Sequence, residues 1–193
     1  IAALYGSSDF AEVDNVKDLG AEYLMELLSE NQLEHNILTE LFDYIRKLGK
    51  EPLCTPWDEI SLKILYEYGM KTVKIASADL TNHSLLGIAA DLGMIIICST
   101  GMATQEEIEE TSNFLKNKGA IFYFLHCQSS YPASLVDINL SYLESLKKFS
   151  RGGLVGYSSH DLGKNICLAA IARGAKIIEK HFTLEKKMYG PDH

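Results

Sequence analysis

The 193-residue sequence lacks several features that would place it in a common class of protein. It contains no apolar run near the roughly 20 residues that cross a bilayer, and its start does not resemble a signal peptide. Its Lys and Arg residues never cluster beyond a pair, and the net charge is −8. We therefore expect no membrane segment, no nucleic-acid surface and a cytoplasmic location.

Cysteine is scarce, and its spacing excludes common metal and redox motifs. The sequence has 4 cysteines, and no two of them form a CxxC pair. Cys54, Cys98 and Cys127 lie inside apolar, strand-like runs, where a reduced and packed thiol is the expected state. No GxGxxG segment follows any apolar run, which disfavours a dinucleotide-binding α/β protein.

Short apolar runs recur along the chain, and each is continuous rather than alternating. This pattern is typical of strands that are buried on both faces of a sheet. The runs cover residues 52–56, 72–77, 95–101, 121–127, 154–159 and 176–183. Amphipathic patterns predict helices at 15–28, 35–49, 61–70, 104–119 and 164–174, the fourth with Thr104 and Glu107 in capping-box spacing.

Strands that alternate with helices predict a parallel sheet, and polar residues follow every predicted strand. A (β/α)₈ TIM barrel explains both features, because its functional residues lie at the carboxyl ends of its strands. Only six strands are predicted, so we expect residues 1–193 to form one incomplete barrel domain that contains strands three to eight. We expect such a piece alone to be catalytically silent and to self-associate through its open strand edges.

Two histidines, His160 and His181, end the last two predicted strands. Imidazoles at neighbouring strand ends suit a divalent transition metal, although each could instead be an ordinary hydrogen-bonding residue. Lys74 lies within an apolar strand, where a lysine needs an anionic partner. That partner could be a bound phosphate, or it could be a structural carboxylate such as Asp79 or Glu179.

Two carboxylates are candidates for acid–base work or for binding sugar hydroxyls at the same strand ends. Asp79 follows the second predicted strand, and Asp192 follows a Gly-Pro turn, where a solvated loop aspartate is the simpler interpretation. His126 precedes Cys127 within its strand, so its side chain is expected to point away from the site and to be structural.

From about Pro52 to His193, the chain closely resembles the sialic acid synthase family. The resemblance is carried in order by "CTPWD", "VKIASADLTN", "ICSTGMAT", "LHCQSSYPA", "VGYSSHDLG", "EKHFTL" and "GPDH". Members of this family condense phosphoenolpyruvate with N-acetylmannosamine or related amino sugars. The resemblance implies a TIM barrel followed by a small antifreeze-like domain, which we expect to be absent from residues 1–193. It also implies a domain-swapped homodimer that uses a divalent metal, typically Mn²⁺, with Mg²⁺ or Co²⁺ as alternatives.

The resemblance also implies a role for individual residues. The metal ligands match His160 and His181, and Asp79 matches the acidic residue that handles protons. Residues that hold phosphoenolpyruvate match Thr55, Lys74, Ser77, Ser99 and Ser158, and sugar contacts match Ser129, Tyr131 and Asp192. The chain departs from the family pattern at Gln128, Ser129 and Ser159, and these departures could alter which sugar is preferred.

Two other interpretations of the sequence remain open. Phosphoenolpyruvate-dependent synthases that make seven- or eight-carbon keto acids share the barrel and the chemistry, although "HCQSSYP" and "GPDH" favour the sialic acid group. The chain could also be a non-catalytic barrel fragment that binds a partner, although the pair of histidines and Lys74 argue against this.

Overall fold

The computed structural model describes residues 33–188, and the chain divides into two compact units, Ile1–Leu53 and Cys54–His193. In the first unit, helix α3 (His35–Lys47) buries Phe42 and carries Arg46 and Lys47 in its last turn, where cations complement the helix dipole. This confirms the helix predicted at 35–49, whereas the helix predicted at 15–28 lies outside the described residues. The expectation of one domain over residues 1–193 stays a prediction.

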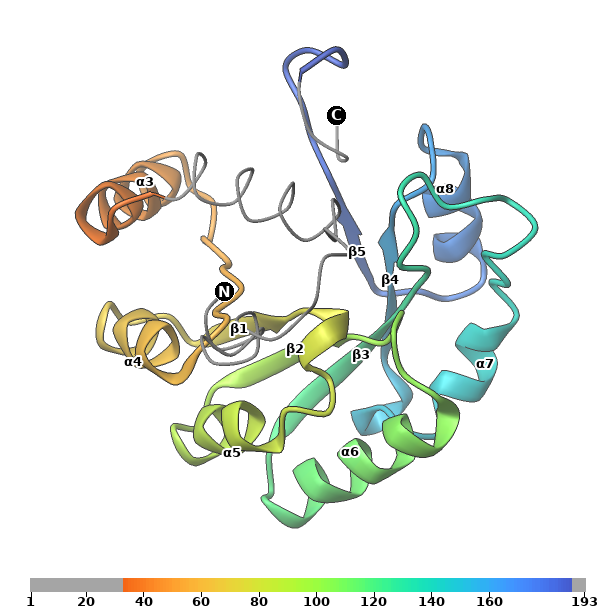
Figure 1. The fold of residues 1–193 in the computed structure, drawn as a ribbon, viewed down its shortest axis with the longest axis horizontal. Helices are drawn as coiled ribbons and strands as arrows, with labels where there is room; N and C mark the ends of the chain where they lie inside the picture. The colour runs from red at the N-terminus through yellow and green to blue at the C-terminus, as the bar shows by residue number, and fades with distance from the viewer. Residues whose placement is uncertain (1–32, 189–193) are drawn as a thin grey trace, which may run out of the picture. The chain divides into compact units, whose positions relative to one another are not determined.

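A five-stranded parallel sheet forms the centre of the second unit, with its strands in sequence order. The strands are β1 (Thr72–Ile75), β2 (Ile95–Ser99), β3 (Ile121–Cys127), β4 (Val155–Ser159) and β5 (Ile177–Lys180). Figure 1 shows the sheet curling into part of a barrel, with helices along its outer face. The predicted parallel α/β architecture is therefore confirmed over this part of the chain.

The outer helices are α4 (Glu59–Glu67), α5 (His83–Asp91), α6 (Gln105–Asn117), α7 (Tyr142–Leu146) and α8 (Asn165–Ala172). The predicted capping box at α6 is present, since the Thr104 side chain accepts a hydrogen bond from the Glu107 amide and the Glu107 side chain accepts one from the Thr104 amide. Short 3₁₀ turns follow β1 at η2 (Ser77–Asp79) and precede β4 at η3 (Arg151–Gly153). Each helix therefore returns the chain to the same edge of the sheet, as a parallel arrangement requires.

Strand β4 is buried along its whole length and packs closely against both neighbours. A Cβ atom at Gly156 would lie 2.3 Å from the Cδ2 atom of Leu125 and 2.5 Å from the backbone oxygen of Ile177. Only glycine fits at this position, because a strand that approaches its neighbours so closely leaves no space for a side chain.

The strand predicted at 52–56 was wrong. This segment forms no strand, and its Cys54 carbonyl accepts a single backbone hydrogen bond, from the Lys74 amide. Pro52 and Pro56 lack the amide hydrogens that a sheet ladder needs, which explains why the pairing does not continue. Strands β1, β2 and β5 are also shorter than predicted, because the polar residues at their ends leave the sheet.

All four cysteines carry free thiols, and Cys98 and Cys127 are buried within strands as expected. Cys167 is buried on α8, and Cys54 is partly exposed. Within residues 33–188, none of the helices is both long enough and apolar enough to cross a membrane.

Candidate active site

A cavity of about 150 Å³ lies at the carboxyl ends of the strands. Seven of the residues that the sequence predicts for the site line this cavity. They are Lys74, Ser77, Ser99, Ser129, Tyr131, Ser158 and His160. The parallel sheet brings them together from different parts of the sequence, since the carboxyl ends of parallel strands meet at one edge.

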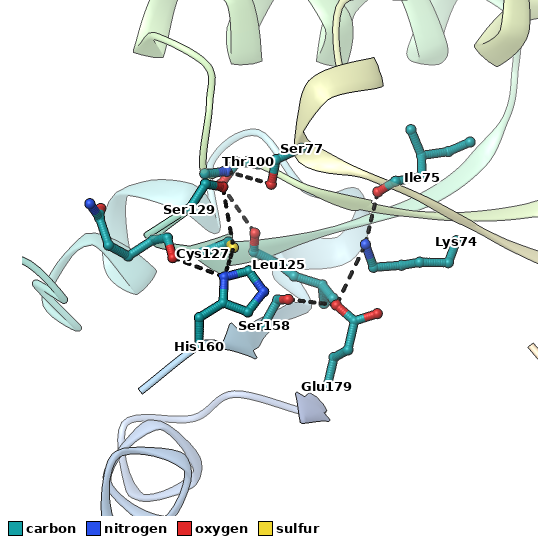
Figure 2. Close-up of polar contacts among 12 residues, drawn as sticks. Lys74, Ile75, Ser77, Thr100, Leu125, Cys127, Ser129, Ser158, His160 and Glu179 are labelled. Carbon is teal, nitrogen blue, oxygen red and sulfur yellow. Dashed lines mark hydrogen bonds and ion pairs between the residues drawn. The ribbon is translucent and has the colours of Figure 1, made fainter. Parts of the chain in front are cut away.

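Lys74 is the buried cation of this cavity, with only 7% of its side chain exposed. Its Nζ atom donates to the Ile75 carbonyl at 2.9 Å and lies 3.5 Å from Oε2 of Glu179 (Figure 2). The Ser158 hydroxyl donates to the same Glu179 oxygen. Of the two structural partners considered for Lys74, the structure therefore selects Glu179.

The hydroxyl of Ser99 is buried beside Lys74 in the cavity wall, and it has no hydrogen-bond partner among the described residues. A buried hydroxyl is ordinarily satisfied, so Ser99 indicates a place where a polar ligand could bind. Ser77 accepts a hydrogen bond of 3.0 Å from the Gly101 amide. A Cβ atom at Gly101 would lie 2.4 Å from the Ser129 hydroxyl, so glycine allows the ends of β2 and β3 to approach each other.

His160 follows β4 and is held from the side of β3. Its Nδ1 atom lies 3.0 Å from the Gln128 carbonyl, and its ring stacks on Tyr131 with centroids 4.1 Å apart. The backbone oxygen of His160 accepts a hydrogen bond of 2.9 Å from the Ala133 amide. In the neutral tautomer that is protonated at Nδ1, this nitrogen donates its hydrogen bond to the Gln128 carbonyl. Nε2 then carries the lone pair that a metal can bind.

His160 also lines a second cavity, of about 280 Å³, and this one includes His181. The described part of the chain contains no group of three or more His, Cys, Asp and Glu side chains arranged to hold a metal ion. The two imidazoles that line this cavity are donors of the type that divalent transition metals bind, with water or substrate oxygens as the remaining ligands. The carbonyl that holds Nδ1 of His160 is a typical partner of a metal-binding histidine.

The side chains of His126 and Cys127 project to opposite sides of β3. Nε2 of His126 bonds the Ile138 carbonyl, which confirms a structural role, and burial lowers the pKa of this histidine. Cys127 lines the first cavity, with its sulfur 3.9 Å from Nδ1 of His160. Burial raises the pKa of the Cys127 thiol, but hydrogen bonds with His160 and neighbouring serines outweigh it, so the net pKa is lowered.

Two predicted site residues, Thr55 and Asp79, line neither of these two cavities. Thr55 is partly exposed in the segment before α4, and Asp192 lies outside the described residues. Asp79 is 4% exposed on η2, and its Oδ1 atom accepts a hydrogen bond of 3.0 Å from the Asn82 side chain. Oδ2 of Asp79 is buried without a partner among the described residues. The roles assigned to these residues stay predictions.

Six further residues line the first cavity without having been predicted for it, namely Trp57, Ala76, Ala78, Met102, Cys127 and Glu179. A signal for Cys127 was present in the sequence, because strand alternation places it opposite the structural His126. The same alternation places the side chains of Glu179 and His181 on one side of the chain at the end of β5. Trp57 and Met102 lie in loops, and no repeating sequence pattern predicts the direction of a loop side chain.

Known proteins resemble this chain in both sequence and structure. An N,N'-diacetyllegionaminic acid synthase from Campylobacter jejuni is 42% identical over 175 residues, which are 89% of this chain and 52% of that protein. The crystal structure of an N-acetylneuraminic acid synthetase from Leptospira borgpetersenii, in complex with citrate, superposes with a TM-score of 0.81 at 38% identity, and the match covers 85% of this chain and 57% of that one.

A more distant likeness extends to another group of synthases. A DAHP synthase from Thermotoga maritima superposes with a TM-score of 0.61 at 21% identity, over 77% of this chain and 46% of that one, which shows a shared fold. The chain spans about half the length of the curated relatives that it matches. The profile of the NeuB family matches residues 4–193, and the chain therefore belongs to the NeuB family.

Proposed function

We propose that this chain is part of an enzyme that condenses phosphoenolpyruvate with N-acetylmannosamine or a related N-acylated amino sugar. The products are a nine-carbon 2-keto sugar acid and phosphate. The observation that carries the proposal is the first cavity, where a buried lysine, an unsatisfied serine hydroxyl and a histidine converge at the carboxyl ends of parallel strands. Membership of the NeuB family, and the names of the relatives, support the same chemistry.

The phosphate of phosphoenolpyruvate binds beside Lys74. The ammonium group supplies a charge-assisted contact, and Ser77, Ser99 and Ser158 supply hydroxyl donors around it. Binding requires Ser158 and Lys74 to exchange their contacts with Glu179 for contacts with the phosphate. Thr55, which precedes the cavity residue Trp57 by two positions, completes this half of the site.

His160 and His181 would hold a divalent metal, which we expect to be Mn²⁺. When bound, the metal supplies Lewis-acid chemistry that polarises the aldehyde oxygen of the open-chain sugar. The Gln128 carbonyl and the Tyr131 ring orient His160 toward this task. Ser129, Tyr131 and Asp192 contact the sugar, so differences at these positions select among related acceptors.

Carbon 3 of phosphoenolpyruvate attacks the aldehyde carbon, water adds at carbon 2, and phosphate leaves by cleavage of its carbon–oxygen bond. Lys74 and the serine hydroxyls stabilise the departing phosphate, an electrostatic contribution of about 3 kcal/mol for a well-placed donor. We assign proton transfer at the new hydroxyl or at the water to Asp79, whose buried Oδ2 must become accessible to the substrate for this step. In the full-length protein the site is completed within a domain-swapped homodimer.

The experiment that tests the proposed function is mass spectrometry of the products that the full-length protein forms from phosphoenolpyruvate and a panel of N-acylated amino sugars. We expect a nine-carbon acid and release of phosphate, together with loss of turnover and of Mn²⁺ binding in His160→Ala and His181→Ala. A seven- or eight-carbon product from a sugar phosphate would refute the proposal. The absence of any product with folded protein and Mn²⁺ would also refute it.

A further inference from the structure

A cluster of buried polar side chains lies at the ends of β4 and β5, and no step of the proposed chemistry uses it. Tyr157, Ser159 and Asp161 are at most 2% exposed. The Tyr157 hydroxyl donates to Oδ1 of Asp161 at 2.9 Å, and the Ser159 hydroxyl donates to the same oxygen at 2.6 Å. Nζ of Lys180 donates to the Ser159 hydroxyl at 2.9 Å and also to the backbone carbonyl of Asp161.

The cluster contains sequence neighbours of both proposed metal ligands. Ser159 and Asp161 are the immediate neighbours of His160, and Lys180 immediately precedes His181. Ser159 and Lys180 are also register partners in the parallel pairing of β4 with β5. Lys180, which precedes His181, is therefore hydrogen-bonded to both sequence neighbours of His160.

Packing alone does not account for a carboxylate at position 161. Burying a charge is costly, and an apolar side chain of similar size would stabilise the fold at least as well. Oδ1 of Asp161 accepts two hydrogen bonds, whereas its buried Oδ2 has no partner among the described residues. A buried carboxyl group that accepts hydrogen bonds from two neighbouring side chains is better explained by the geometry it imposes than by the stability it adds.

We propose that Asp161, with Tyr157, Ser159 and Lys180, forms a positioning cluster that fixes the separation of His160 and His181. The cluster sets the affinity of the metal site without contacting the metal. This inference rests on the proposed function, because it assumes that both histidines bind the metal. Contacts from the segment that follows β3, at Gln128 and Ala133, hold His160, and the positioning cluster holds its neighbours Ser159 and Asp161.

The test is calorimetric titration of the metal-free full-length protein with Mn²⁺, alongside its melting temperature in the absence of metal. We expect Asp161→Ala to weaken Mn²⁺ binding by about 10- to 100-fold, the effect typical of losing a partner of metal ligands. Asp161→Asn keeps an acceptor oxygen and should recover part of the affinity. Tyr157→Phe removes one hydroxyl and should weaken binding less than Asp161→Ala.

Asp91→Ala is the matched control, because it also removes a carboxylate, but one that pairs with Lys118 at an exposed site. This variant should keep the affinity for Mn²⁺. A lower melting temperature with unchanged Mn²⁺ affinity in Asp161→Ala would overturn the inference and leave the cluster purely structural. If Asp161→Ala does not fold, unchanged affinity in folded Tyr157→Phe overturns it equally.

Titration of His160→Ala separates this inference from the proposed function. Wild-type Mn²⁺ affinity in that variant refutes the metal assignment, and the inference fails with it. Lost affinity in His160→Ala together with full affinity in the Asp161 variants refutes only the positioning cluster.

Discussion

Replacement of Lys74 by methionine tests the phosphate half of the site most directly. The change keeps the length of the stem and removes the ammonium group from a side chain that is only 7% exposed. Truncating one partner of a buried charge pair costs about 2–5 kcal/mol of binding free energy. We expect the lower part of this range, because phosphoenolpyruvate must first displace Glu179 from Lys74, so its net gain is smaller than in an unpaired site. About 2–3 kcal/mol corresponds to roughly 30- to 150-fold weaker binding of phosphoenolpyruvate.

The same substitution should have little effect on stability. Glu179 is 40% exposed, so water can solvate its carboxylate after the ion pair is lost, and it still accepts from Ser158. Removing a buried cation also removes the cost of keeping it dehydrated. We therefore expect the free energy of unfolding to change by about 1 kcal/mol or less.

The measurements are the dissociation constant of phosphoenolpyruvate by calorimetry and the melting temperature of the same full-length protein. Lys118→Met is the matched control, because Lys118 pairs with Asp91 at the surface and should leave phosphoenolpyruvate binding unchanged. The opposite pattern in Lys74→Met, with a fall of several degrees in melting temperature and unchanged affinity, would show that Lys74 is only the structural partner of Glu179.

Three further predictions concern the fold. Gly156→Ala should destabilise the protein by about 1–3 kcal/mol in urea unfolding, since the new methyl group meets the Ile177 backbone, and unchanged stability would contradict the packing of β4. Burial lowers the pKa of His126 below 6.5, so the unfolded chain binds a proton more readily than the folded chain. The free energy of unfolding should therefore fall as the pH drops from 6.5 through the lowered pKa. His126→Gln should flatten this pH dependence in urea titrations. Residues 1–193 expressed alone should self-associate in light scattering, because β1 and β5 are the edge strands of the sheet within residues 33–188, and Phe182 and Leu184 beyond β5 are exposed. A stable monomer would contradict this.

The sequence was informative wherever a run of apolar residues or a helix-capping residue determines the local structure. Continuous apolar runs predicted β1 to β5, and the Thr104–Glu107 spacing predicted the start of α6. Those signals depend on neighbours a few residues away, which the sequence displays directly. The apolar run at 52–56 was misleading because its prolines, rather than its hydrophobicity, decide whether a ladder can form.

The candidate site was predictable as a set of residues but not as a set of contacts. Their positions near strand ends predicted that Lys74, Ser99 and Ser158 lie together at the carboxyl ends of the strands. The structure confirms this, since all three residues line the first cavity. The choice of Glu179 over Asp79 as the partner of Lys74 depends on the turn η2, which places Asp79 against Asn82 instead. The partner of a side chain in the site depends on how strands that are far apart in the sequence are aligned in space. No repeating pattern in the sequence contains that information.

Strand β4 connects the two halves of the proposed chemistry. Ser158 and His160 are two residues apart, so the alternation of an extended chain directs both to the same side. Ser158, His160 and Glu179 line both cavities, which makes the phosphate region and the histidine region neighbours across shared side chains. In the proposed function, Ser158 and His160 therefore act together from the end of one buried strand. Ser158 would hold the phosphate and His160 would hold the metal, at a separation set by one strand rather than by a flexible loop.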